Sequence, residues 1–305
     1  MADAKPTLFS RLAGVARFLF WALLIYIAAQ AFFAPNQLQV KRAQALAAFQ
    51  EERKSRVIVM IHRSDRVSFL GAPVGGFIGI EDSESVLRAI RLTPDQTPID
   101  LILHTPGGLV LAAEQIARAL LDHKGKVTVF VPHYAMSGGT MIAMAADEIV
   151  MDPNAVLGPV DPQIGGMPAA SIVRVTEIKP VERTSDQILI LADMSRKAQT
   201  QVRDIVTELL SESGQMGADR AAEVAKTMTE GRWTHDFPIT VRTARGLGFK
   251  VSTDMPRSVY GIMELYPQAG SRRPSVVYLD SPSGGAMPQP SPPSEPAESS
   301  PPARR

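Results

Sequence analysis

The feature of this sequence that most constrains its fold is an order of buried strand, glycine-containing turn and helix that occurs twice in succession. In the first copy, the apolar residues 99–103 lead through Gly107-Gly108 into the amphipathic stretch 109–121. In the second, the apolar run from Val127 leads through Ser137-Gly138-Gly139 into another helical pattern. Strands connected through helices pair in parallel, with right-handed crossovers. The sequence therefore predicts an α/β fold with a parallel sheet.

The position of the two turns predicts a site. In a parallel sheet, the turns that follow the strands lie at one edge. We therefore expect Gly107-Gly108 to lie close to Ser137, in a pocket that receives backbone N–H donors from both turns.

Ser137 is the best nucleophile candidate because it stands between a strand and the first turn of a helix. The N–H groups of that turn could stabilise an oxyanion, and glycines beside the serine let a substrate carbonyl approach the backbone. The alternative is that Ser137 only caps the helix, since serine is common at this position. The surrounding sequence is also not the Gly-x-Ser-x-Gly nucleophile elbow. The residues alone leave both interpretations open.

An apolar run of about 17 residues, 18–34, lies near the N-terminus, which is at the short end for a membrane-spanning helix. We expect a single-pass N-terminal membrane anchor that ends at Pro35, in preference to a signal peptide cleaved near Ala29-Gln30-Ala31. Basic residues lie on both sides of the run, so the side of the membrane is not decided.

Four segments are predicted: an N-terminal segment with the anchor at 1–35, a helical linker at 36–55, the α/β domain at 56–270 and a disordered tail rich in Pro and Ser at 271–305.

Composition excludes several classes of site. The chain has no cysteine, which excludes disulfides, thiolate metal sites and a cysteine nucleophile. A formal net charge of +1 and the lack of an aromatic and basic stripe argue against a nucleic-acid partner. Neither a His-Glu-x-x-His pattern nor a Gly-x-Gly-x-x-Gly fingerprint occurs, so neither a metal nor a cofactor is predicted.

The turn Thr105-Pro106-Gly107-Gly108, followed about 30 residues later by Ser137-Gly138-Gly139-Thr140, resembles the ClpP/crotonase superfamily of serine peptidases. Signal peptide peptidase A is similar as well. The stretches LILHTPGGLVLAAEQIARAL, VFVPHYAMSGGT and ADEIVMDPNAVLGPVDPQIG more closely resemble the serine dehydrogenase proteinase family, whose members often carry one N-terminal membrane segment. The resemblance covers roughly residues 56–267.

The resemblance implies a spiral of strand-strand-helix units with Ser137 as the nucleophile. It implies an oxyanion hole made by the backbone N–H groups of Gly108 and Gly138. ClpP-type peptidases take a histidine base from the loop after the serine helix, but the corresponding loop 158–163 contains none. This departure counts against a Ser-His-Asp triad.

Signal peptide peptidase A and related membrane peptidases use a later lysine as the base, and two lysines are in range. Lys179 lies 42 residues after Ser137, behind an apolar stretch whose burial would lower its pKa. Lys197, beside Arg196 on a long helix, is the alternative base. His104 and His133 precede the two turns and could face the pocket, although structural roles are the simpler interpretation.

The remaining histidines, His62, His123 and His235, have no spacing that indicates a metal site.

Together these features predict a membrane-anchored serine endopeptidase of the Ser-Lys dyad type, with Ser137 as nucleophile and Lys179 as general base. We expect a homo-oligomer that cleaves peptides or membrane-protein fragments. Two alternatives stay open: a crotonase-like enzyme acting on acyl-CoA thioesters, and a catalytically inactive membrane scaffold of the same fold.

Overall fold

The computed structural model describes residues 8–62, 68–69, 72–73 and 76–266, and within α1 it leaves the side chains of 8–13 and 30–36 undescribed. The tail expected to be disordered, at 271–305, lies outside these residues.

The centre of the fold is a five-stranded sheet in the order β1-β4-β5-β7-β12, in which all neighbouring strands pair in parallel. Its strands are β1 (Arg56–Ile61), β4 (Ile99–His104), β5 (Val127–Val131), β7 (Glu148–Met151) and β12 (Val251–Ser252). The strands follow one another across the sheet in chain order. The predicted α/β class with a parallel sheet is confirmed.

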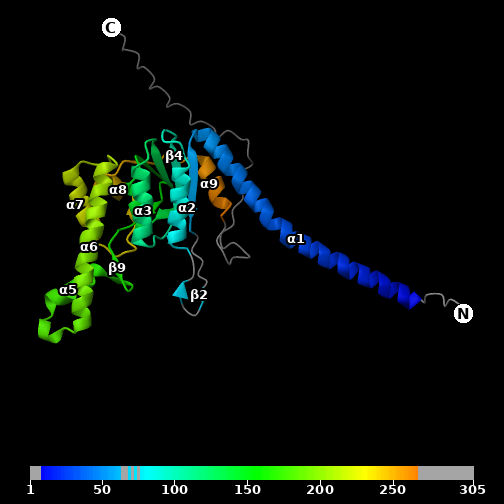
Figure 1. Cartoon of the computed structure of the whole chain (residues 1–305), viewed down its shortest axis with the longest axis horizontal. Helices are drawn as coiled ribbons and strands as arrows, with labels where there is room; N and C mark the ends of the chain where they lie inside the picture. The colour runs from blue at the N-terminus through cyan, green and yellow to red at the C-terminus, as the bar shows by residue number, and fades with distance from the viewer. Residues whose placement is uncertain (1–7, 63–67, 70–71, 74–75, 267–305) are drawn as a thin grey trace, which may run out of the picture. The chain divides into compact units, whose positions relative to one another are not determined.

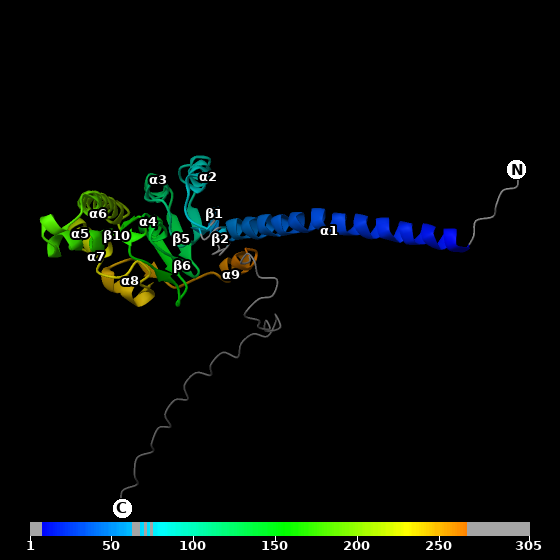
Figure 2. The same ribbon diagram turned by 90° about the horizontal axis from the view of Figure 1, so that it is seen from below.

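Helices cover both faces of this sheet. The helices of the described residues are α1 (Leu8–Arg53), α2 (Ile80–Arg91), α3 (Val110–Leu121), α4 (Gly138–Met144), α5 (Ala169–Ile178), α6 (Asp186–Glu212), α7 (Ala218–Thr229), α8 (Val241–Leu247) and α9 (Arg257–Glu264), with a 3-10 turn at Val181–Arg183. The α5–α6 hairpin extends away from the sheet (Figure 1). Figure 1 shows α2 and α3 side by side in front of the sheet, and Figure 2 shows α9 on the opposite face.

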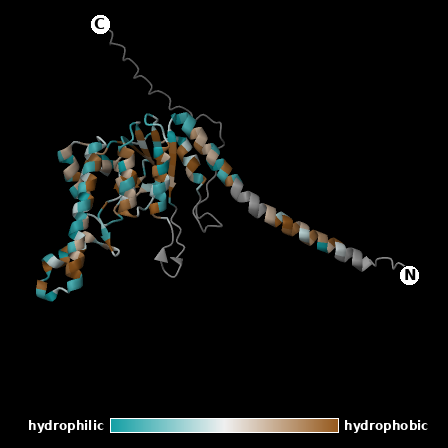
Figure 3. Cartoon of the chain, in the orientation of Figure 1, coloured by the Kyte–Doolittle hydropathy of each residue, from teal (hydrophilic) through white to brown (hydrophobic). Residues whose placement is uncertain are grey.

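The hydrophobic core has two parts, one on each face of the main sheet, because successive side chains along a strand point to opposite faces. On β4, Leu101 and Leu103 belong to the larger buried cluster, which lies under α2, α3 and α4. Ile102 points to the other face, where Phe130 packs edge-on against Phe49 of α1 at a ring separation of 5.8 Å. Both faces of β4 are thus buried, as in parallel sheets generally. Figure 3 shows the strands of the main sheet as predominantly hydrophobic.

A second, three-stranded sheet in the order β11-β8-β6 lies at the ends of the main strands. It consists of β6 (Tyr134–Ala135), β8 (Val156–Leu157) and β11 (Ile239–Thr240). Strand β11 runs antiparallel to β8, with Ile239 opposite Leu157. The residues that follow β8 and those that precede β11 therefore lie at the same end of this pair. Two further short pairs are β2 (Ser68–Phe69) with β3 (Ala72–Pro73) and β9 (Gln163–Ile164) with β10 (Met167–Pro168).

The prediction of a single-pass membrane anchor at residues 18–34, and with it the membrane localisation, is wrong. Within the part of the chain that the structure describes, no helix is both long enough and apolar enough to cross a membrane. The run of about 17 apolar residues is at the short end of the length that such a helix needs.

Helix α1 also continues through Pro35, where we expected a break, and is one element from Leu8 to Arg53. A proline inside a helix removes one N–H donor. The helix-favouring Ala, Gln, Glu, Lys and Arg residues that follow Pro35 oppose this effect. The C-terminal end of α1 is fastened to the domain by Arg53, whose Nε donates to Oδ2 of the buried Asp100 at 2.8 Å.

Candidate active site

The turn after β4 is made of two glycines that the surrounding backbone requires. Gly107 has a φ of +107°, and a Cβ built on it would lie 2.8 Å from Cβ of Ser137. A Cβ on Gly108 would lie 2.3 Å from the carbonyl oxygen of Ile78, closer than real Cβ contacts. Only glycine fits at both positions, because the first needs a left-handed backbone and the second has no space for a side chain.

The turn after β4 is hydrogen-bonded directly to the turn after β5. The N–H of Thr105 donates to the carbonyl of Tyr134 at 3.1 Å, and the N–H of Met136 donates to the carbonyl of Thr105 at 2.9 Å. These two bonds join the segments just before Gly107 and just before Ser137. The expected proximity of the two turns is therefore confirmed, and it follows from the parallel pairing of the preceding strands.

Ser137 has an unusual backbone conformation, with φ 51° and ψ −117°. It is one of two non-glycine residues with positive φ in the part of the chain that the structure describes. It stands at the N-cap of α4, yet its side chain makes no capping hydrogen bond. The capping interpretation therefore does not account for its hydroxyl. Strained conformations of this kind cost about 1–3 kcal/mol and are concentrated at functional sites.

The backbone N–H groups of Gly108 and Gly138 lie next to each other. A Cβ built on Gly138 would lie 3.6 Å from the Gly108 nitrogen. Among the described residues, neither N–H donates to another protein group. Gly138 is also the first residue of α4, and the N–H groups of the first turn of a helix have no hydrogen-bond partner within the helix. Two adjacent donors at a helix start can stabilise a negative oxygen beside Ser137.

A cavity of about 290 Å³ contains both Ser137 and these two glycines. Its walls consist of Phe77, Pro106, Gly108, Val110, Ser137, Gly138, Met141, Val160, Asp161, Pro162, Gln163 and His235. The wall is mostly apolar and includes one carboxylate and one imidazole. Of these two side chains, the imidazole is the type that exchanges protons near neutral pH.

Asp161 and His235 form a pair in the wall of this cavity. Nδ1 of His235 lies 2.8 Å from Oδ1 of Asp161, and Nε2 of Gln163 donates to Oδ2 of the same carboxylate at 2.7 Å. The Asp161 side chain is 2% exposed, whereas that of His235 is 34% exposed. The hydrogen bond to Asp161 raises the pKa of His235, against the lowering effect of burial.

Strand pairing brings the two residues together. Asp161 follows β8 and His235 precedes β11, and these strands are neighbours in the second sheet. The N–H of Val160 donates to the carbonyl of Met228 at 3.0 Å, which fastens the Asp161 loop to the end of α7. The loop that carries His235 is closed by the stacking of Trp233 on Phe237, with ring centroids 5.1 Å apart.

The two lysines predicted as bases do not line this cavity. Lys179 is exposed and lies at the end of α5, in the turn of the α5–α6 hairpin. Lys197 is exposed on α6, where its ammonium pairs with Asp193 at 2.5 Å. Of the residues predicted to form the site, Ser137, Gly108 and Gly138 line one cavity within a single chain, and neither lysine does.

The histidines considered from the sequence occupy other places. His104 is fully buried and stacks on His133, with ring centroids 5.7 Å apart, and neither residue lines the cavity. Nδ1 of His62 lies 2.8 Å from Oγ1 of Thr105, which accepts a hydrogen bond from the N–H of Gly107 at 3.2 Å. Through Thr105, His62 thus stabilises the turn that contains Gly107.

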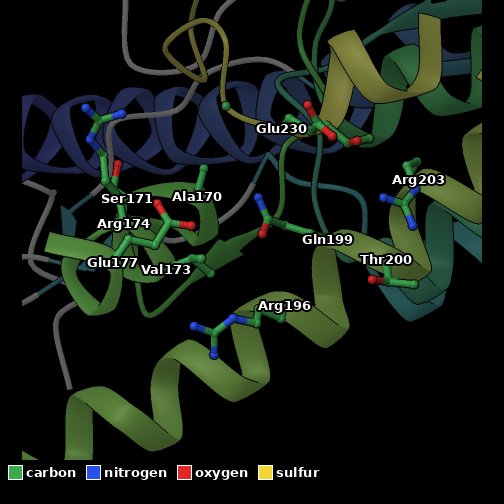
Figure 4. A pocket seen from close by; sticks show the side chains of 12 residues that line it. Ala170, Ser171, Val173, Arg174, Glu177, Arg196, Gln199, Thr200, Arg203 and Glu230 are labelled. Carbon is green, nitrogen blue, oxygen red and sulfur yellow. The ribbon is translucent and has the colours of Figure 1, made fainter. Parts of the chain in front are cut away.

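A second cavity, of about 530 Å³, lies along the α5–α6 hairpin and the end of α7 (Figure 4). Charged side chains line it, including Arg174, Glu177, Arg196, Arg203 and Glu230. Ser171 is also present, but the lining includes no histidine or lysine that could act as its base. The Ser137 cavity is therefore the candidate active site.

Sequence reasoning missed His235 because it lies 74 residues from Asp161 in the chain. The available signal was in loop 158–163, which lacks a histidine but carries the acidic residue Asp161. A carboxylate next to a predicted nucleophile calls for a search for a distant histidine, since the two residue types work together in acid-base chemistry.

Comparison with known proteins shows the family of the chain. The sequence matches a family described as ClpP-like SDH-type serine proteinase over residues 7–290. Two uncharacterized proteins of Methanocaldococcus jannaschii are similar: one is 52% identical over 268 residues, covering 87% of this chain and 90% of the relative. The other is 51% identical over 268 residues, covering 88% and 93%.

Among solved structures, a variant of the 1510-N membrane-bound stomatin-specific protease is 20% identical, with a TM-score of 0.42 over 61% of this chain and 80% of that one. The family match spans nearly the whole sequence. The chain therefore belongs to the family of ClpP-like SDH-type serine proteinases.

Proposed function

We propose that this protein is a serine peptidase in which Ser137 attacks the carbonyl carbon of a peptide bond. The observation that carries the proposal is the position of Ser137: it is strained, its hydroxyl is not used for capping, and it opens on a cavity beside two backbone N–H donors. Membership in a serine proteinase family supports the same activity.

In this mechanism, the N–H groups of Gly108 and Gly138 stabilise the oxyanion of the tetrahedral intermediate. Each such donor typically contributes about 10²–10³-fold to kcat. Collapse of the intermediate releases the amine and leaves an acyl group on Ser137, which water then hydrolyses. A base must take the serine proton, because a serine hydroxyl is a weak nucleophile at neutral pH.

The cavity wall favours an apolar side chain on the substrate. Val110, Met141 and Val160 contribute to the wall, and Phe77 at its edge is 49% exposed. Covering this surface with an apolar residue removes it from water, at roughly 25 cal/mol per Å². The proposed substrates are therefore peptides with an apolar residue next to the cleaved bond.

The Ser-Lys dyad remains a prediction. Lys179 could reach Ser137 only if the α5–α6 hairpin moved or if a second copy supplied the residue, because in its own chain it lies outside the cavity. Its side chain is also exposed in its own chain.

A homo-oligomer also remains a prediction. It is supported by exposed apolar side chains on the α5–α6 hairpin, where Ile178, Val181 and Ile190 are 61–69% exposed. Light scattering of the purified protein at several concentrations tests it, and a mass equal to that of one chain throughout would contradict it.

The activity is tested with a fluorophosphonate probe, which reacts only with an activated serine. We expect labelling at Ser137, located by mass spectrometry, and hydrolysis of fluorogenic peptides with an apolar residue before the scissile bond. Both should be lost in Ser137→Ala. A folded wild type that is not labelled and cleaves no peptide would contradict the proposal.

A further inference from the structure

We infer that a chain of three side chains, Asp82, His62 and Thr105, positions the turn that carries Gly108, so that the Gly108 N–H can stabilise the oxyanion. The three act through this turn and are positioning residues. The inference rests on the proposed serine peptidase function, in which Gly108 is one of two oxyanion donors. It follows from a closed set of contacts on both sides of Gly108, made by side chains that do not line the Ser137 cavity.

Thr105 contacts both turns of the site. It is fully buried, and its Oγ1 accepts the N–H of Gly107 at 3.2 Å. Its backbone carbonyl accepts the N–H of Met136, the residue before Ser137, at 2.9 Å. Its methyl group lies against Gly139 on the serine helix, where a Cβ would come within 2.5 Å of Thr105 Cγ2. A shift of Thr105 would therefore move the glycine turn relative to the serine helix.

His62 sets the direction of the Thr105 hydroxyl. Nδ1 of His62 lies 2.8 Å from Thr105 Oγ1, and Nε2 lies 3.4 Å from Oδ1 of Asp82. Because a carboxylate only accepts, Asp82 favours the ring tautomer with the hydrogen on Nε2. Nδ1 of the neutral ring then accepts the hydroxyl hydrogen, and Oγ1 keeps a lone pair for the N–H of Gly107. All three hydrogens then point from Gly107 towards Asp82, and each has an acceptor.

Asp82 connects this chain back to the turn through the segment before α2. Its Oδ2 accepts the N–H of Gly79 at 2.7 Å. The neighbouring Ile78 donates its N–H to the carbonyl of Gly107 at 2.8 Å, and its carbonyl accepts the N–H of Leu109 at 2.9 Å. The residues before and after the oxyanion donor are therefore both hydrogen-bonded to this segment.

These contacts leave the N–H of Gly108 free. The N–H of Gly107 donates to Thr105, and the N–H of Leu109 donates to Ile78. Among the described residues, the N–H of Gly108 donates to no protein group. A preorganised donor acts on the oxyanion without reorganising during the reaction. Its position matters, because a displacement of about 1 Å can lower the rate by about 10²-fold.

Loss of the chain should change kcat rather than KM. Asp82, His62 and Thr105 do not line the cavity, so their substitution removes no contact with a substrate bound there. The oxyanion forms in the transition state and is absent from the bound peptide. A misplaced donor therefore weakens transition-state binding and leaves ground-state binding unchanged.

The test uses the whole chain in matched pairs of variants. In each pair, one variant removes the polar contact and the other keeps it: His62→Leu with His62→Asn, and Thr105→Val with Thr105→Ser. The amide of His62→Asn stands where Nδ1 stands in the imidazole. Asp82→Asn keeps an acceptor for the N–H of Gly79 but removes the charge beside Nε2.

Two controls remove the same side-chain types elsewhere. His123→Leu removes a histidine whose Nε2 lies 2.7 Å from the carbonyl of Thr97. Thr93→Val removes a buried threonine whose Oγ1 donates to the carbonyl of Ala89 at 2.8 Å. Neither His123 nor Thr93 lines the Ser137 cavity.

The readouts are kcat and KM on an apolar fluorogenic peptide and the Ki of a peptide aldehyde, whose adduct with Ser137 places an oxyanion in the same site. Hydrogen exchange of residues 105–109, followed by mass spectrometry, reports on the turn itself. Circular dichroism and Tm establish folding. Fluorophosphonate labelling of the wild type at Ser137 is measured alongside.

We expect His62→Leu and Thr105→Val to lower kcat by about 10- to 10²-fold and to weaken the aldehyde by a similar factor, with KM within about threefold of wild type. Residues 105–109 should exchange faster in both. His62→Asn and Thr105→Ser should recover kcat to within about fivefold of wild type. Asp82→Asn should lower kcat by at least about threefold, because the tautomer is no longer fixed. The two controls should stay within about twofold.

Three results would overturn the inference: kcat within about threefold of wild type in His62→Leu and Thr105→Val, an effect on KM in place of kcat, or a His62→Asn variant as impaired as His62→Leu. If His62→Leu and Thr105→Val do not fold, Asp82→Asn decides, since its side chain is 34% exposed, and an unchanged kcat and Ki would overturn the inference. With a wild type that is labelled and active, these results leave the peptidase intact. A wild type with neither labelling nor activity would instead remove the proposed function, and the inference with it.

Discussion

His235 Nδ1 lies 2.8 Å from Asp161 Oδ1 although the two residues are 74 positions apart in the chain. The pair is formed by the antiparallel contact of β11 with β8, which brings the two loops to one end of the second sheet. Both side chains also line the Ser137 cavity. The second sheet therefore positions the serine, which follows β6, as well as the pair.

Replacing Ser137 by glycine should raise the stability of the protein while abolishing its activity. Glycine adopts a φ of 51° with a ψ of −117° at lower cost than serine or alanine. We expect Ser137→Gly to be more stable than Ser137→Ala by about 1 kcal/mol, within the usual range of such strain. Urea unfolding of the two variants measures this difference, and a Ser137→Ala variant of equal or greater stability would show that the backbone is not strained.

Adding a methyl group at Gly138 should damage catalysis more than folding. Its Cβ would lie 3.0 Å from Cβ of Ala113 and 3.6 Å from the Gly108 nitrogen, beside the oxyanion donors. We expect kcat of Gly138→Ala to fall by at least about tenfold, since displacing one donor costs up to about 10²–10³-fold.

The matched control for Gly138 is Gly246→Ala, on the exposed side of α8, where a Cβ meets nothing within 4 Å. This variant should gain up to about 1 kcal/mol of stability from helix propensity and keep its activity. Gly108→Ala should misfold, because its Cβ would lie 2.3 Å from the Ile78 carbonyl oxygen. Steady-state kinetics and thermal melts separate the three cases, and a fully active Gly138→Ala would argue against the oxyanion hole.

Thr140 connects the serine helix to the loop that carries Asp161. Its Oγ1 donates to the carbonyl of Ala135 at 2.7 Å and accepts from the N–H of Gly158 at 2.9 Å, and the residue is fully buried. Thr140→Val keeps the shape but leaves two buried polar groups without a partner. We expect a loss of about 1–3 kcal/mol in the free energy of unfolding, together with a lower kcat. The exposed Thr227→Val should change stability by less than about 0.5 kcal/mol, and equal effects of the two substitutions would refute this role.

The stability of the protein should depend on pH through His235. Its pKa in the folded state is raised above the ordinary value of about 6.5 that it has when unfolded. The stabilising contribution is therefore fully present below that ordinary value and is lost as the pH rises through the folded-state pKa. The difference in unfolding free energy between wild type and His235→Gln should decrease from pH 5.5 to pH 8.5. A difference that is constant across this range would show that the pKa is not raised.

Peptides with an apolar residue before the scissile bond should be cleaved with a higher kcat/KM than the same peptides with Asp at that position. The reason is the apolar wall formed by Val110, Met141 and Val160. Burying one methylene contributes about 1 kcal/mol, so kcat/KM should also be at least about tenfold higher with Leu than with Ala before the scissile bond. A panel of matched fluorogenic peptides measures it, and equal rates for Leu and Asp would rule out this cavity as the specificity pocket.

Much of the site was predictable because its parts lie in short, continuous segments. The turn with Gly108 follows β4, and Ser137 follows β5 and the short β6. Because β4 and β5 pair in parallel, the two turns lie at the same edge of the sheet. The N-terminal membrane anchor was predicted wrongly, because an apolar run of marginal length does not by itself distinguish a spanning helix from other helices.

The sequence by itself determined the α/β fold, the position of the serine at a strand-to-helix turn and the two glycines beside it. These are local properties, set by the periodicity of apolar residues and by the φ angles that glycine allows. Only the tertiary structure decided which titratable side chains line the Ser137 cavity. It placed Asp161 and His235 in the cavity and left Lys179 exposed outside it, because burial and side-chain contact depend on strand pairing between segments that are far apart in the chain.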